Sequence, residues 1–134
     1  MHALSPPGAP HHPTVLIVDD HEDTREMLKL LLSLEQVTVV EAKDGNEAYD
    51  FAVKESPDLI FMDLTLPKVD GLAATRKIRQ DKRIGRTPII FLSGRAEPAG
   101  RIAAYEAGCD GFLVKPIDVD EVLNMVKLWA RTVS

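Results

Sequence analysis

Short apolar runs alternate with longer segments of mixed polarity along this chain of 134 residues. Four runs consist almost entirely of β-branched or bulky apolar side chains, and they cover residues 15–18, 59–62, 89–92 and 112–114. Apolar runs of this length are typical of strands that are buried on both faces of a parallel sheet. A shorter strand is predicted over residues 37–41. Together these segments indicate one sheet of five strands.

The segments between the runs have the spacing of helices. We expect helices over residues 22–34, 46–55, 72–81, 98–107 and 119–132. The first of them carries a wide apolar face made of Met27, Leu28, Leu31, Leu32 and Leu34. The regular alternation predicts an α/β fold of the type (βα)5, with right-handed crossovers and helices on both faces of the sheet.

The last predicted helix has two apolar sides. The inner side, which should pack on the sheet, consists of Val119, Val122, Leu123, Val126 and Ala130. Leu128 then falls on the opposite side, with Met125 toward it and Trp129 at the border. Met and Trp are enriched in interface cores, so this outer side is a candidate surface for a partner protein or for a homodimer.

Composition limits the classes of protein that fit. The chain is 45% hydrophobic, and its length suits one domain with a proper core. We expect a disordered, proline-rich leader over residues 1–13 and one domain over residues 14–132. The formal net charge of −5 disfavours direct binding to nucleic acid, since such domains normally carry a basic patch.

The sequence also indicates where the protein is located and what role its single cysteine has. No apolar segment is long enough to span a membrane, and the N-terminus lacks the pattern of a signal peptide, so we expect a cytoplasmic protein without membrane insertion. Cys109 is the single cysteine of the chain and cannot form an internal disulfide. We interpret it as a small structural side chain in the core.

Polar side chains that carry chemistry follow four of the predicted strands. Asp19 and Asp20 follow the first strand, Asp63 the third, Ser93 the fourth and Lys115 the fifth. The carboxyl ends of parallel strands meet at one edge of an open α/β sheet, where ligands bind. A single aspartate there would be an ordinary helix-capping residue. Five such residues at four strand ends indicate a site.

The residue types suggest phosphoryl chemistry at this site. Clustered carboxylates repel one another unless a cation neutralises them. Oxygen ligands with no histidine or cysteine nearby suit Mg²⁺ rather than zinc. A carboxylate beside such an ion can attack phosphorus and form an aspartyl phosphate. A lysine and a hydroxyl would then hold the phosphoryl oxygens, because phosphoryl transfer relies mostly on positioning and charge neutralisation.

Taken together, the motifs at these strand ends resemble the receiver domain of two-component response regulators, the CheY-like family. They are Val18-Asp19-Asp20, Met62-Asp63-Leu64 with Pro67 and Asp70-Gly71, Leu92-Ser93-Gly94, and Val114-Lys115-Pro116. The resemblance covers residues 14–132. It implies a flavodoxin-like three-layer sandwich with a parallel sheet in the order 2-1-3-4-5.

The resemblance also implies a role for each site residue. Asp63 corresponds to the phosphoacceptor, Asp20 to the direct Mg²⁺ ligand, and Asp19 to a ligand that acts largely through water. The backbone carbonyl of Thr65 corresponds to the third protein ligand. Lys115 corresponds to the counter-ion of the phosphoryl group, and its bond to the following proline is expected to be cis.

Two further residues correspond to the switch of the family. The Ser93 hydroxyl would bond the phosphoryl group, and Phe112 occupies the aromatic switch position. Phe112 lacks the hydroxyl of the tyrosine that is also common there, and Gly94 stands where alanine is usual. Thr65 and Arg95 lie at the variable positions that tune the lifetime of the phosphoryl group in this family.

Other classes share parts of the pattern. A flavin-binding electron carrier has the same topology, but the acidic residues after the first strand would repel its phosphate. A haloacid-dehalogenase-like phosphatase spaces its paired acids by one residue, and here His21 stands at the position that would pair with Asp19. The remaining alternative is a phosphorylation-independent pseudo-receiver that acts as a protein-binding module, although such proteins usually lack a key residue.

We therefore expect a stand-alone response regulator receiver, which is a phosphoacceptor signalling protein rather than a metabolic enzyme. Asp63 would accept a phosphoryl group from a histidine kinase or a histidine phosphotransfer protein in a Mg²⁺-dependent reaction. The changed surface would then act on a downstream protein target.

Overall fold

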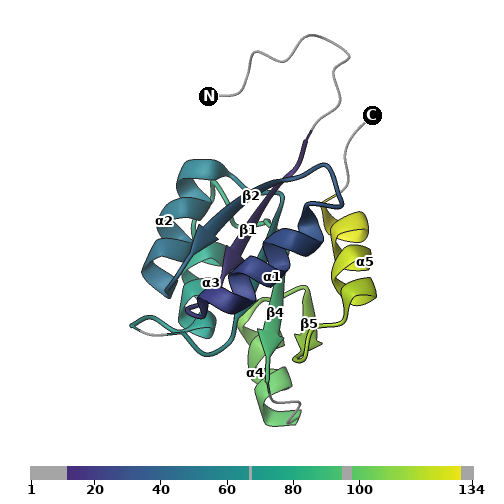
Figure 1. Ribbon diagram of the computed structural model, residues 1–134. Coiled ribbons are helices and arrows are strands. Elements are labelled where there is room, and N and C mark those ends of the chain that lie inside the picture. Colours follow the sequence, from purple (N-terminus) through teal and green to yellow (C-terminus); the bar gives the residue numbers. More distant parts are fainter. Residues whose placement is uncertain (1–11, 67, 95–97, 131–134) are drawn as a thin grey trace.

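The described part of the chain forms a parallel sheet of five strands between two layers of helices (Figure 1). The computed structural model describes residues 12–66, 68–94 and 98–130. The strands are β1 (Thr14–Val18), β2 (Thr38–Ala42), β3 (Leu59–Asp63), β4 (Ile89–Ser93) and β5 (Gly111–Val114). The helices are α1 (Glu22–Leu32), α2 (Gly45–Glu55), α3 (Gly71–Gln80), α4 (Pro98–Ala107) and α5 (Val119–Trp129). The order β2-β1-β3-β4-β5 confirms the predicted flavodoxin-like topology.

Alternate side chains of each strand build two separate hydrophobic clusters. Along β1, Leu16 and Val18 belong to the cluster under α2, α3 and α4. Val15 and Ile17 belong to the cluster under α1 and α5. Successive strand side chains point to opposite faces, so a strand that is covered on both faces must be apolar throughout. The continuous apolar runs of the sequence have this cause.

Aspartate caps fix where three helices begin. The helices α2, α3 and α5 follow Asp44, Asp70 and Asp118, whose carboxylates accept hydrogen bonds from backbone amides of the first turn. Such bonds satisfy amide groups that have no partner inside the helix. Because of these caps, α2 and α3 each begin one residue earlier than the apolar pattern alone predicts.

The first helix buries a narrower stripe than predicted. Leu28 and Leu32 are fully buried, whereas Met27 is 40% exposed and Leu34 is 69% exposed. The predicted wide apolar face is therefore wrong at Met27 and Leu34. Leu34 lies beyond the end of α1 at Leu32. Met27 is rotated by about 100° from Leu28 around the helix axis, which turns it away from the sheet.

The last helix confirms part of the prediction on each of its two sides and corrects the rest. Val122 and Val126 are buried, and Leu128 is 61% exposed, as expected. Met125 instead packs against the hydrophobic cluster under α1 and α5, so its placement on the outer side is wrong. It follows Val122 by three residues, and residues at this spacing share a helix face. Val119, predicted to be inner, is 45% exposed.

Several predicted features lie outside the described residues. These are the leader up to residue 11, Pro67, Arg95 and the predicted helical residues after 130. Pro13, at the end of the predicted leader, is buried, and its carbonyl accepts a hydrogen bond of 2.8 Å from the Thr38 amide. None of the helices in the described ranges has the length and apolar character needed to cross a membrane.

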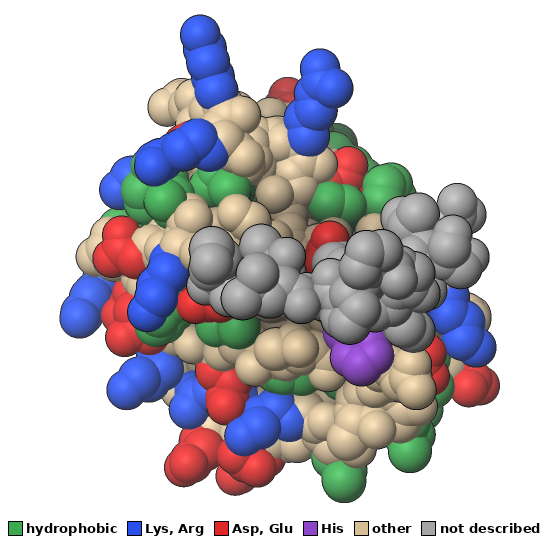
Figure 2. Space-filling model, turned by 90° about the horizontal axis from the view of Figure 1, so that it is seen from above, with side chains coloured by type: hydrophobic (Ala, Val, Ile, Leu, Met, Phe, Trp, Pro, Cys, Tyr) green, Lys and Arg blue, Asp and Glu red, His purple; other side chains and the backbone are tan. Residues whose placement is uncertain are grey.

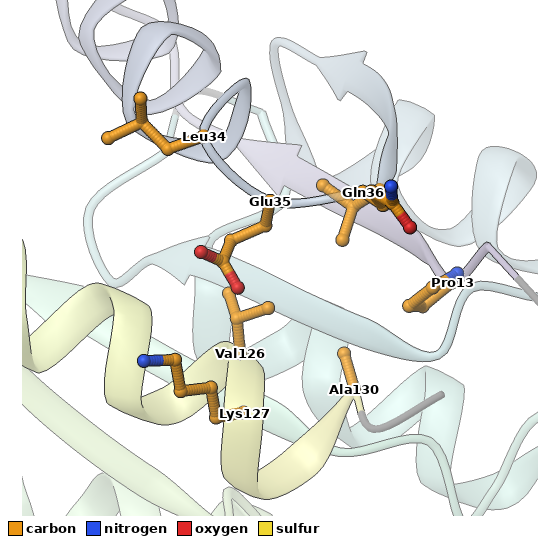
Figure 3. Close-up of a pocket in the computed structure, with 8 residues that line it drawn as sticks. Pro13, Leu34, Glu35, Gln36, Val126, Lys127 and Ala130 are labelled. Carbon is orange, nitrogen blue, oxygen red and sulfur yellow. The ribbon is translucent and has the colours of Figure 1, made fainter. Parts of the chain in front are cut away.

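A pocket lies at the end of the sheet where the strands begin. The segment between α1 and β2, including Leu34 and Gln36, lines one side, and Val126 and Lys127 of α5 line the other together with Ala130, which follows the helix (Figure 3). Figure 2 looks onto this end of the molecule, and side chains of both charges are interspersed over its visible part. The chemistry predicted from the sequence belongs to the opposite end of the sheet, where the strands finish.

Close packing of α2 depends on a residue without a side chain. A Cβ atom on Gly45 would overlap the backbone carbonyl of Val69 and lie 2.8 Å from the Val69 Cβ atom. The start of α2 therefore presses directly on the segment that connects β3 to α3. Gly100, in α4, is a helical glycine with free space around it, because a Cβ atom there would meet nothing within 4 Å.

Gly45→Ala should destabilise the domain by about 3 kcal/mol, because a methyl group is forced against backbone. Gly100→Ala is the matched control and should raise the free energy of unfolding by up to about 1 kcal/mol, since alanine favours a helix. Urea unfolding of both variants measures the difference. A Gly45→Ala protein as stable as the wild type would contradict this packing.

Candidate functional site

The ends of β1, β3 and β5 bring three charged side chains together. Asp63 is the last residue of β3 and is 4% exposed, and Asp19 follows β1 and is fully buried. The Lys115 Nζ atom lies 3.1 Å from Asp19 Oδ2 and 3.7 Å from Asp63 Oδ1. The lysine therefore bridges two buried carboxylates that are far apart in the sequence.

Backbone pairing fixes the remaining predicted residues around Asp63. Ser93 ends β4 and is buried, and its carbonyl accepts a hydrogen bond of 2.7 Å from the Lys115 amide. The Thr65 amide donates to Asp63 Oδ1 at 3.3 Å. The Lys115-Pro116 bond is cis, as the resemblance implies. The strand ends thus place the predicted hydroxyl, lysine and phosphoacceptor at one edge of the sheet.

The glycine after Asp70 lets the start of α3 lie directly against the backbone of Asp63. A Cβ atom on Gly71 would lie 2.5 Å from the Asp63 carbonyl oxygen and 3.1 Å from a ring atom of Phe91. A larger residue would push against the backbone that carries Asp63. The Asp70-Gly71 pair of the sequence therefore combines a helix cap with a close approach to the site.

Burial and charge act together on Asp63. Removal from water raises the pKa of its carboxyl group, and the negative charge of Asp19 raises that pKa further. The Lys115 ammonium and the Thr65 amide act in the opposite direction but do not cancel these effects. Ionised Asp63 is therefore held in an unfavourable environment, which a cation or a positively charged neighbour would relieve.

Asp63→Asn should stabilise the protein at neutral pH in the absence of divalent ions, because it removes a carboxylate whose pKa is raised by burial and by the charge of Asp19. The raised pKa means that the ionisation of Asp63 costs more in the folded state than in the unfolded state. This penalty is absent below the ordinary pKa of an aspartate, about 4, and grows as the pH rises through the folded-state pKa. The stabilising effect should therefore disappear in acid.

Chemical unfolding in a chelator at several pH values measures this effect. Asp50→Asn, which removes an exposed carboxylate from α2, is the control for the change in net charge. A gain of equal size in both variants, or a gain for Asp63→Asn that persists below pH about 4, would contradict the electrostatic explanation.

Two residues of the site were missed in the sequence interpretation. His21 Nδ1 lies 3.1 Å from Asp19 Oδ1 and 3.2 Å from Asp20 Oδ1, so the expectation of oxygen donors without a nearby histidine is wrong. Arg25 donates to the Asp19 carbonyl at 2.9 Å and to Glu41 Oε1 at 3.0 Å. Arg25 follows His21 by four residues, and this helical spacing is the signal that could have indicated it.

The predicted switch residue and the cysteine are also located by the structure. Phe112 is half-buried and packs against the hydrophobic cluster under α2, α3 and α4, with the Arg101 guanidinium 5.2 Å from its ring centre. Cys109 is 8% exposed. Its burial, and the nearby charge of Asp110, raise the pKa of its thiol to about 11. A thiol that stays protonated at neutral pH agrees with a structural role.

The acidic residues fit a divalent cation. Ligand atoms of Asp19, Asp20, His21 and Asp63 all lie within 4.8 Å of one another. Asp20 has a side chain that is 36% exposed, so it offers a carboxylate at the solvent side of the buried pair. Carboxylate oxygens grouped in this way are the ligands of Mg²⁺ and of similar hard ions.

Comparisons with known proteins agree with this geometry. A model of the response regulator receiver domain family matches residues 15–127. The transcriptional regulatory protein SrrA of Staphylococcus aureus (strain NCTC 8325 / PS 47) is 38% identical over 117 residues, which are 87% of this chain and 47% of that protein. The chain thus spans about half the length of the curated relatives that it matches.

Solved structures of receiver domains are similar over most of the chain. The receiver domain of the sensor histidine kinase PA1611 from Pseudomonas aeruginosa PAO1, with a magnesium ion in its active site cleft, is 30% identical with a TM-score of 0.82, covering 89% of this chain and 98% of that one. The chemotaxis protein CheY4 of Vibrio cholerae is 28% identical with a TM-score of 0.83, covering 89% and 99%. The family model matches most of this chain, and this match shows that the chain belongs to the response regulator receiver domain family.

Proposed function

We propose that Asp63 accepts a phosphoryl group from a histidine kinase or a histidine phosphotransfer protein. The observation that carries this proposal is the position of the Asp63 carboxylate, 3.7 Å from Lys115 Nζ and within the acidic cluster. The carboxylate is 4% exposed at the end of β3, with the Lys115 ammonium and the Asp19 carboxylate as charged neighbours. This is the arrangement that a carboxylate nucleophile for phosphorus needs.

The transfer forms one bond and breaks one bond. A carboxylate oxygen of Asp63 attacks the phosphorus atom of a phosphohistidine, and the bond between phosphorus and the imidazole nitrogen breaks. The nitrogen keeps the electron pair of that bond and takes a proton from solvent. In this proposal Lys115 neutralises charge on the phosphoryl oxygens, and the Ser93 hydroxyl donates a hydrogen bond to one of them.

The residues that would hold a divalent cation are Asp20, Asp19, Asp63 and the carbonyl of Thr65. When bound, Mg²⁺ would supply positive charge to the carboxylates and to the phosphoryl oxygens. The magnesium ion in the related PA1611 receiver domain supports this assignment. The raised pKa of Asp63 supports it as well, because that carboxylate lacks enough positive charge from Lys115 alone.

Phosphorylation would change the surface around α4 and β5. If Ser93 moves toward the phosphoryl group, space opens behind it for the Phe112 ring, which already packs at the edge of a hydrophobic cluster. The result would be a shift between two populations rather than a new fold. The downstream protein target would then bind the shifted surface, and the exposed Leu128 on α5 is a candidate contact for a partner or for a second copy.

A small phosphodonor tests the proposal without a partner. Acetyl phosphate with Mg²⁺ should add one phosphoryl group to the intact chain, visible by mass spectrometry, and a chelator should prevent the addition. The alternative is a pseudo-receiver, for which no addition is expected. An unmodified chain after incubation with the donor and Mg²⁺ would therefore favour the pseudo-receiver.

A further inference from the structure

The imidazole of His21 is directed at the acidic cluster. Its Nδ1 atom lies within 3.2 Å of a carboxylate oxygen of Asp19 and of Asp20. The His21 backbone amide also donates to Asp19 Oδ1 at 2.9 Å, which holds the residue close to the buried carboxylate. The side chain itself is 68% exposed, so the ring is not pressed into this position by surrounding packing.

Helix capping does not explain this orientation, in which the ring lies at hydrogen-bonding distance from Asp19. His21 is the N-cap residue of α1, a position where a side chain commonly accepts a hydrogen bond from the first turn of the helix. The His21 side chain makes no such capping bond. Its ring nitrogen is directed instead at the carboxylate oxygens where a cation would bind.

An imidazole nitrogen changes which cation a carboxylate cluster prefers. Mg²⁺ binds oxygen ligands and water, and gains little from nitrogen. First-row transition ions accept imidazole readily, and their affinity for sites that contain nitrogen exceeds that of Mg²⁺. The His21 Nδ1 atom lies among carboxylate oxygens that are all within 4.8 Å of one another, so one ion could contact both donor types.

We propose that His21 Nδ1 is a direct ligand of the cation in this site and that it gives the site a preference for transition ions such as Mn²⁺ over Mg²⁺. The inference rests on the proposed cation site of Asp63 and its neighbours, but it does not require that Asp63 accept a phosphoryl group. His21 is then a residue that determines metal specificity, and the three carboxylates supply the remaining protein charge.

Mn²⁺ is the appropriate probe for this proposal. It is the weakest binder in the transition series, so exposed histidines elsewhere in the chain capture little of it. It is also paramagnetic, so a directly bound nitrogen modulates its pulsed electron paramagnetic resonance signal. His12 is an exposed histidine outside the cluster and offers a matched control.

The experiment uses the full chain without phosphodonor at one mildly alkaline pH. Mn²⁺ and Mg²⁺ affinities are measured for the wild type, His21→Ala, His21→Gln and His12→Ala. Both His21 variants should lose about tenfold in Mn²⁺ affinity, while their Mg²⁺ affinity stays within about twofold. His12→Ala should change neither affinity. The wild type should show nitrogen modulation of the Mn²⁺ signal, and both His21 variants should lose it.

Three results would overturn the proposal. The first is a wild-type Mn²⁺ signal without nitrogen modulation, and the second is modulation that survives in both His21 variants. The third is an equal loss of Mn²⁺ and Mg²⁺ affinity, which would assign His21 to positioning the carboxylates. Because no phosphodonor is present, these results are independent of phosphorylation. Failure of the phosphoacceptor function would appear only in the acetyl phosphate experiment.

Discussion

Asp63→Asn should reduce the incorporation of a phosphoryl group from acetyl phosphate by roughly a thousandfold or more, as expected when a nucleophile is removed. The amide of asparagine lacks the charged oxygen that attacks phosphorus. The fold should remain intact, because the raised pKa of the Asp63 carboxyl group shows that its negative charge is unfavourable in the folded protein, and the substitution removes that charge. Time courses of the phosphorylated fraction, measured by mass spectrometry, give the two rates.

Asp50→Asn is the control for this comparison, since it removes one exposed carboxylate from α2 and should leave the rate unchanged. If Asp63→Asn were phosphorylated at the wild-type rate, the acceptor would be another residue. If both variants lost the reaction, net charge rather than the identity of the acceptor would explain the result.

Asp20→Asn should lower the affinity for Mg²⁺ at least tenfold, because it removes a charged oxygen from a site with few protein ligands. Asp20 is suited to this test because its side chain is 36% exposed and the substitution leaves the core untouched. Isothermal titration of the chain with MgCl2 measures the affinity. Stability in a chelator should change little, as is usual for surface substitutions.

Glu22→Gln is the matched control for Asp20. Glu22 begins α1 and is exposed, and it lies outside the group of residues whose ligand atoms surround the site. Its loss should weaken Mg²⁺ binding only through long-range charge, which salt screens. Equal affinities for Asp20→Asn and Glu22→Gln would contradict the assignment of Asp20 as a ligand.

The sheet and the strand-end residues could be predicted because both depend on simple constraints. A strand that is covered on both faces must be apolar throughout, so β3 and β4 stand out in the sequence as continuous apolar runs. The parallel direction of the strands then places their last residues at one edge. The closeness of Asp19, Asp63 and Lys115 follows from these two facts, and the structure places both carboxylates within 4 Å of the Lys115 Nζ atom.

Side-chain direction on the helices could not be predicted as well. Met27 and Met125 are apolar residues next to buried ones, and the rotation of each helix decided which of them faces the sheet. Periodicity gives a stripe but not its width, so an apolar residue at the edge of a stripe can lie on either side. The direction of the His21 ring could not be predicted from the sequence either, because the contacts of the ring depend on the conformation of the turn between β1 and α1.

Polar contacts between residues far apart in the sequence could not be predicted either. Arg79 of α3 donates to the carbonyls of Gly108 and Thr87, at 2.8 Å and 2.6 Å, and to the carboxylate of Asp110 at 2.8 Å. These bonds tie α3 to the segments that precede β4 and β5. Nothing in the spacing of the chain indicates them, because they join residues that meet only after the sheet has formed.

The most direct test of the central claim is to locate the phosphoryl group itself. The phosphorylated chain is treated with borohydride, which reduces an aspartyl phosphate to homoserine and releases inorganic phosphate. Peptide mapping should then find homoserine at position 63 and at no other position, only after incubation with donor and Mg²⁺. Homoserine at Asp19, Asp20 or any other aspartate, or none in a folded chain exposed to donor and Mg²⁺, would contradict the account.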